Sequence, residues 1–91
     1  MKAARIDATH AEIVQALRSH GCGVQSLAAI GKGCPDLLVS YRGQWHVLEV
    51  KARKGLLRCA QFVWASRHQA PVAVVRTVDD ALGACGMSRR S

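Results

Sequence analysis

Two carboxylates and one ammonium group are the side chains of this 91-residue chain whose types and spacing best suit chemistry. Asp36 directly precedes an apolar run at 37–41, and Glu49 and Lys51 lie at the end of a second run at 44–51. If these runs pair as antiparallel strands around a two-residue turn, Asp36 lies opposite Glu49, with Lys51 on the same face. Because opposed like charges destabilise a sheet, we expect a bound cation or a functional role here. A simple ion pair at a strand end is the alternative.

The charge balance favours a polyanionic partner. Thirteen Lys and Arg residues against six Asp and Glu give a net charge of +7. Nucleic acid is therefore the first expectation, although a charge that only keeps the protein soluble would look the same. The length predicts a single domain, with a core at about 8–84 and frayed termini. No apolar run reaches the roughly 18 residues of a membrane span, and the N-terminus does not resemble a signal peptide, so we expect a soluble cytoplasmic protein.

Two kinds of site are not indicated by the motifs. The four cysteines have no CxxC spacing, which argues against a zinc ribbon or a thioredoxin-type centre. We expect them to be free thiols acting as small core hydrophobes in a reducing compartment. No GxxxxGK[ST] motif is present, so no P-loop is expected. We also expect no organic cofactor.

The chain reads as an α/β domain in the order α-β-β-β-α-β-α. A capping box from Thr9 to Glu12 and the stop at Gly21 predict a first helix over 8–20. Thr77 predicts the cap of a last helix. The remaining elements follow from apolar periodicity and from Gly and Pro: strands at 24–30, 37–41, 44–51 and 72–75, and helices at 57–68 and 78–84.

Both faces of the predicted hairpin are apolar, which indicates a central strand pair covered on both sides. Trp45 and Val47 are expected to face inward on the second face. In the helix at 57–68, Ala60, Val63 and Trp64 are expected to point into the core.

At these residues the chain resembles the PD-(D/E)xK nuclease superfamily, and more closely its VRR-Nuc (virus-type replication-repair nuclease) branch. The resemblance covers about residues 9–82. It rests on Glu12, Gly33-Cys34-Pro35-Asp36-Leu37, Glu49-Val50-Lys51, Gly55 and Gln61. It implies a restriction-endonuclease-like core with a mixed central sheet flanked by helices. It also implies a metal-dependent endonuclease, similar to stand-alone phage and bacterial members, some of which cut branched DNA such as four-way (Holliday) junctions as homodimers.

The acid pair suits that chemistry. Phosphodiester hydrolysis needs an activated water and charge stabilisation at phosphorus, and a divalent cation supplies both. Mg²⁺ or Mn²⁺ takes oxygen ligands, so Asp36 and Glu49 are suited to share one. The ammonium of Lys51 would stabilise developing negative charge. The resemblance adds the backbone carbonyl of Val50 as a further metal ligand.

Other residues have both ordinary and functional interpretations. Glu12 is either a helix-capping residue or, by the resemblance, a carboxylate of the metal site. Gln61 is either an exposed helix residue or a hydrogen-bond donor to the phosphate or the water. His10 or His20 as general base is a weaker possibility. Four basic residues flank the acid pair in sequence and are expected to contact DNA phosphates: Lys32, Arg53, Lys54 and Arg58.

Three alternatives stay open from the sequence. A DNA-binding module without catalysis would share the charge and the fold. A nuclease acting on flaps or nicks, or on RNA, would share the acid pair. A dimer is expected from the small size of the chain and from the resemblance, since a chain of this length buries a modest core.

Overall fold

A four-stranded mixed sheet organises the molecule in our computed structural model. The structure describes the backbone of residues 2–87 and the side chains of residues 9–87; the predicted fraying at 88–91 lies outside the described residues. The strand order is β1-β2-β3-β4, with β1, β2 and β3 antiparallel and β4 parallel to β3. The element order matches the prediction. The elements are α1 Lys2–Ser19, β1 Gly23–Ser26, β2 Leu37–Tyr41, β3 Gln44–Val50, α2 Cys59–Ser66, β4 Ala73–Val75 and α3 Val78–Ala84.

The hairpin register is the predicted one. Tyr41 pairs with Gln44 and Leu37 pairs with Leu48. Arg42 and Gly43 form the two-residue turn, both with positive φ, as type I′ hairpin turns require. The register therefore follows from the length of the turn and the two-residue period of the strands.

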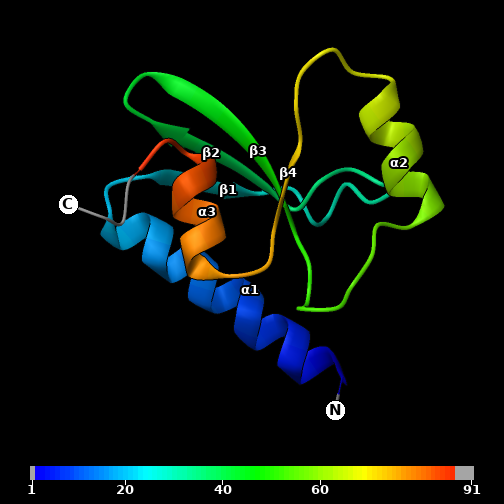
Figure 1. Cartoon of the computed structure of the whole chain (residues 1–91), viewed down its shortest axis with the longest axis horizontal. Helices are drawn as coiled ribbons and strands as arrows, with labels where there is room; N and C mark the ends of the chain where they lie inside the picture. The colour runs from blue at the N-terminus through cyan, green and yellow to red at the C-terminus, as the bar shows by residue number, and fades with distance from the viewer. Residues whose placement is uncertain (1, 88–91) are drawn as a thin grey trace.

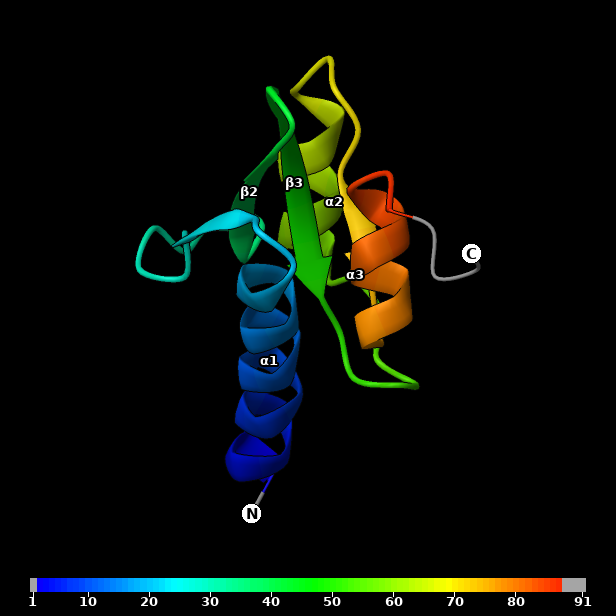
Figure 2. The same ribbon diagram turned by 90° about the vertical axis from the view of Figure 1, so that its left-hand side faces the viewer.

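One face of the sheet carries the core. α1 and α3 lie side by side across this face (Figures 1 and 2). The fully buried large side chains are Ile13 and Leu17 from α1, Leu82 from α3, and Leu37, Val39, Leu48 and Val75 from the strands. Burying such side chains is the main stabilising term of a chain this small.

α2 lies on the other side of the sheet, between two long connections (Figures 1 and 2). Its predicted inward face is wrong at Ala60 and Val63, whereas Trp64 is half-buried. Val63 is 46% exposed and Ala60 is exposed, whereas the polar Gln61 is buried. The predicted burial of Trp45 is also wrong, since 69% of it is exposed. The second face of the sheet is thus only partly covered.

Two predicted boundaries differ from the structure by more than two residues. α1 begins at Lys2, so Thr9 lies inside the helix and the predicted capping box at Thr9 and Glu12 is wrong. β1 ends at Ser26 rather than at residue 30, because Leu27–Ile30 form a turn closed by the bond from the Ile30 N–H to the Leu27 carbonyl. The Thr77 cap is confirmed, since its hydroxyl accepts the Asp80 N–H at 3.0 Å.

The four cysteines are free, as predicted. Cys22 and Cys85 are buried members of the core, and Cys34 is half-buried. Cys59 is exposed at the start of α2, which differs from its expected place in the core. Among the described residues, no helix is long and apolar enough to cross a membrane.

Candidate active site

Asp36 lies at the open end of the β2–β3 hairpin, where the backbone positions it. It follows the buried Pro35 and directly precedes β2. Continued by one step, the observed register places it opposite Glu49. The backbone N–H of Val50 donates to Asp36 Oδ2 at 2.8 Å. This bond fixes the carboxylate across the end of β3.

Glu49 is buried, with 3% of its surface exposed, and its charge is met from two sides. The amide Nε2 of Gln61 donates to Glu49 Oε2 at 2.8 Å. Lys51 Nζ lies 3.6 Å from the same oxygen. The structure therefore brings together Asp36, Glu49, Lys51 and Gln61, the four residues named as catalytic from the sequence.

The electrostatics of the acid pair are unfavourable without a further cation. Burial, and after it the neighbouring Asp36 carboxylate, raise the pKa of Glu49 from 4.5 to about 7. The Lys51 ammonium acts in the opposite direction but does not cancel these two effects. A strongly perturbed acid in a cavity is typical of a functional site.

Gln61 is positioned by the start of its own helix. It is the third residue of α2, and its Oε1 accepts the backbone N–H of Arg58 at 2.8 Å. Because the oxygen is used in this way, the NH₂ group of the amide must face Glu49. The Gln61 side chain therefore both caps α2 and donates to Glu49.

Gly33 lets the loop before Asp36 pass close to α2. Its φ is +83°, and a Cβ at this position would lie 2.1 Å from the Ala60 carbonyl oxygen. Only glycine meets both conditions without displacing backbone. The loop that carries Asp36 and the helix that carries Gln61 are thus fixed against each other.

A cavity of about 520 Å³ opens over these groups. Asp36, Glu49, Val50, Lys51, Arg58 and Gln61 line it, so both expected ligand side chains and the expected backbone ligand meet there. Lys32, Arg53 and Lys54 are exposed and lie outside its lining. Of the four predicted DNA contacts, Arg58 is therefore the one placed at the cavity wall.

α1 presents a histidine to the cavity rather than Glu12. His10 lines the cavity, whereas Glu12 is exposed and makes no contact with the acid pair. The reason is helical periodicity. His10 lies three and seven residues before the buried Ile13 and Leu17, on their face, and Glu12 is rotated away from it. The structure thus gives no support to Glu12 as a ligand.

Arg76 has a role beside the cavity that was not predicted from the sequence. Its Nη1 donates to the carbonyl of Ala52 at 2.9 Å and also to the carbonyl of Gly55. It therefore holds the basic loop that follows Lys51 beside the cavity. No local sequence signal marks this role, because the two partners are more than 20 residues away along the chain.

The donor set fits a hard divalent cation. Oδ2 of Asp36 accepts the bond from the Val50 N–H, and Oε2 of Glu49 accepts the bond from Gln61. Mg²⁺ is typically held by one or two carboxylates, with waters and substrate phosphates completing its coordination. Within residues 9–87, no group of three or more His, Cys, Asp or Glu side chains converges on one point. An ion here would rest on the acid pair and on oxygen atoms of the backbone.

Comparisons with models of known protein families, with curated proteins and with solved structures found no match. Over residues 2–87 the chain is a small α/β domain with a four-stranded mixed sheet and three helices. The residues of the site therefore supply the grounds for a function.

Proposed function

We propose that this chain is a metal-dependent endonuclease that hydrolyses phosphodiester bonds of DNA. The observation that carries the proposal is the buried Glu49, placed opposite Asp36 and contacted by Lys51 in an open cavity. Folding brings two carboxylates together against their repulsion, and a bound cation removes that repulsion. The net charge of +7 favours a nucleic-acid substrate.

Each residue has a defined task in this proposal. Asp36, Glu49 and the Val50 carbonyl would hold Mg²⁺ or Mn²⁺, which supplies activation of water and charge stabilisation at phosphorus. Lys51 places a positive charge beside the acids, where a phosphate oxygen would gain negative charge. Gln61 keeps Glu49 oriented through its bond to Oε2. Arg58 at the cavity wall meets the DNA backbone.

The proposal includes a fold assignment. We infer a restriction-endonuclease-like core in which a hairpin and a parallel fourth strand form the sheet. The inference is supported by the place of the acid pair, which lies at one end of β2 and β3 and lines an open cavity there.

The experiment is cleavage of a panel of substrates with Mg²⁺, Mn²⁺ or EDTA. The panel contains matched duplex, single strand, flap, nicked and four-way junction DNA, together with the duplex as RNA. We expect metal-dependent cleavage that is about tenfold faster on branched DNA, the factor given by ~1.4 kcal/mol of additional contacts. Preferential cleavage of RNA would support the RNA alternative. Binding without cleavage of any substrate would support the DNA-binding module.

We also propose that the chain acts as a homodimer. Large apolar side chains are exposed on the partly covered side of the sheet and on α2: Trp45 69%, Phe62 61% and Val63 46%. A contiguous patch of such side chains on a small protein typically marks an interface. Two sites in one dimer would suit paired cuts in a branched substrate.

We expect light scattering to give twice the mass of one chain, and Phe62→Asp to reduce it to the mass of one chain. A charge buried at an apolar interface costs several kcal/mol, which is enough to separate weakly bound subunits. Gln69→Asp, at an exposed position after α2, is the matched control and should leave the dimer intact. A single-chain mass for the unmodified protein would contradict the dimer.

A further inference from the structure

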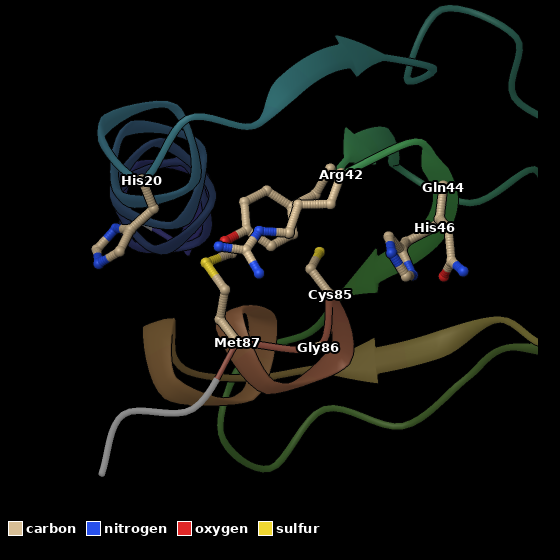
Figure 3. A pocket seen from close by; sticks show the side chains of 8 residues that line it. His20, Arg42, Gln44, His46, Cys85, Gly86 and Met87 are labelled. Atoms are coloured by element: carbon tan, nitrogen blue, oxygen red, sulfur yellow. The ribbon is translucent and has the colours of Figure 1, made fainter. Parts of the chain in front are cut away.

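A second cavity, which we call the turn pocket, lies at the far end of the hairpin from the acid pair. Its volume is about 570 Å³, and it opens between the end of α1, the β2–β3 turn and the end of α3. Six of the residues that line it are His20, Tyr41, Arg42, Gln44, His46 and Cys85. Figure 3 shows the Arg42 guanidinium between His20 on one side and His46 on the other.

The turn pocket is rich in hydrogen-bond donors, and none of the described residues that line it carries a carboxylate. Arg42 lies over the ring of Tyr41, with its guanidinium carbon 5.5 Å from the ring centre. This contact holds the charged group in place while leaving its edge open. Burial raises the pKa of the Cys85 thiol to about 11, so at neutral pH it adds no negative charge. The pocket is therefore suited to an anion.

The backbone at Arg42 supports a functional role for this arginine. Its φ is +51°, in the left-handed region, and the next residue is Gly43 with a φ of +79°. At the first position of such a turn asparagine and glycine are preferred, whereas an arginine is strained. Strained residues of this kind concentrate at binding sites. Arg42 therefore has a strained backbone at the position where its side chain supplies positive charge to the pocket.

The turn pocket and the acid pair face different directions. Gln44 and His46 lie on the core face of β3, and Glu49 lies on the opposite face, because successive side chains alternate. Gln44 and Glu49 are also five residues apart, or about 17 Å at the strand rise of ~3.4 Å. A contact at the turn pocket is therefore separate in space from a contact at the acid pair.

We propose that the turn pocket binds a backbone phosphodiester of a second nucleic-acid segment, such as another arm of a branched substrate whose first arm lies at the acid pair. The inference rests on the proposed function. Among the described residues that line the pocket, Arg42 carries the permanent positive charge, and one such charge matches the single negative charge of a phosphodiester. A free phosphate or a phosphomonoester at pH 7 carries about −1.5 to −2, which exceeds that charge.

The test compares Arg42→Asn with Arg67→Asn. Both remove one exposed positive charge, and Arg67 lies after α2, outside the lining of the turn pocket. Binding is measured by fluorescence anisotropy in EDTA, with a labelled four-way junction and with a linear duplex of the same sequence. We expect Arg42→Asn to weaken junction binding about fivefold and to reduce the salt slope by about 0.9, the value for one phosphate contact. Arg42→Asn should change the affinity for the linear duplex by less than about twofold. Arg67→Asn should change the affinity for either substrate by less than about twofold.

Thermal unfolding guards against a folding defect, since asparagine suits this turn and Arg42→Asn should unfold no earlier than the unmodified chain. Equal effects of the two variants on the junction would overturn the proposal, as would equal weakening of junction and duplex by Arg42→Asn. Competition by excess inorganic phosphate, lost in Arg42→Asn, would also overturn it in favour of a free phosphate. Because EDTA prevents metal-dependent cleavage, this result is independent of the nuclease assay, and either proposal can fail alone.

Discussion

Asp36→Asn is expected to reduce metal-dependent cleavage about 10³-fold, a loss of ~4 kcal/mol in transition-state stabilisation. Asparagine has nearly the same shape as aspartate, and its carbonyl oxygen can still accept the Val50 N–H. The fold is therefore retained while the negative charge that would hold the cation is removed. We expect DNA binding to be largely preserved, because the change removes no positive charge.

Three measurements make this result specific. Asp79→Asn removes the same charge from an exposed position in α3 and should leave cleavage unchanged. Calorimetric titration with Mn²⁺ should show binding to the unmodified chain and a loss of it in Asp36→Asn. Wild-type cleavage by Asp36→Asn in metal-replete buffer would contradict the proposed site. If Mn²⁺ does not bind and DNA still does, the non-catalytic module becomes the better assignment.

Glu49→Gln is expected to abolish cleavage and, at the same time, to stabilise the metal-free protein above neutral pH. In the folded chain the pKa of Glu49 is about 7, compared with 4.5 for the ordinary group. Between these values the folded state binds more protons than the unfolded state, so stability falls as the pH rises. The loss is complete above about pH 7 and is on the order of 3 kcal/mol, since one pKa unit corresponds to ~1.4 kcal/mol. Glutamine carries no charge and lacks this loss.

The measurement is denaturant unfolding in EDTA across that pH range. The unmodified chain should lose stability as the pH rises, and Glu49→Gln should follow a flatter curve. Asp36→Asn is the informative intermediate. Removing its charge lowers the pKa of Glu49, so the decline should be smaller and begin to level off at lower pH. If the stability of the unmodified chain and that of Glu49→Gln fell in parallel as the pH rises, ionisation of the buried Glu49 would not be the cause of the fall.

Adding Mg²⁺ or Mn²⁺ above neutral pH should restore the stability that the charged Glu49 removes. A cation that binds the folded state alone stabilises it by mass action. Neither acid variant should show this gain. Function and stability are therefore opposed at Glu49, as is common where a site must hold a charge in the interior.

The hairpin and the acid pair could be predicted from the sequence for a local reason. A two-residue turn and the alternation of a strand fix which residues face each other, so residues 36 and 49 were bound to meet once β2 and β3 paired. The α3 cap followed in the same way from Thr77 and the N–H group three residues later. These features depend on contacts between residues that are close along the chain or related by a simple period.

Tertiary structure alone decided the surroundings of the acid pair. The placement of α2, and with it Gln61, beside the loop that carries Asp36 depends on Gly33, which allows that loop to pass close to the helix. The choice of His10 over Glu12 depends on which face of α1 packs against the sheet. The anchoring of the basic loop depends on Arg76, more than 20 residues away. Such contacts follow no local period, because they arise only when separate elements pack together. The sequence by itself determined that Asp36 and Glu49 would be placed opposite each other. The tertiary structure determined that Glu49 would be buried and hydrogen-bonded, and that its pKa would be raised.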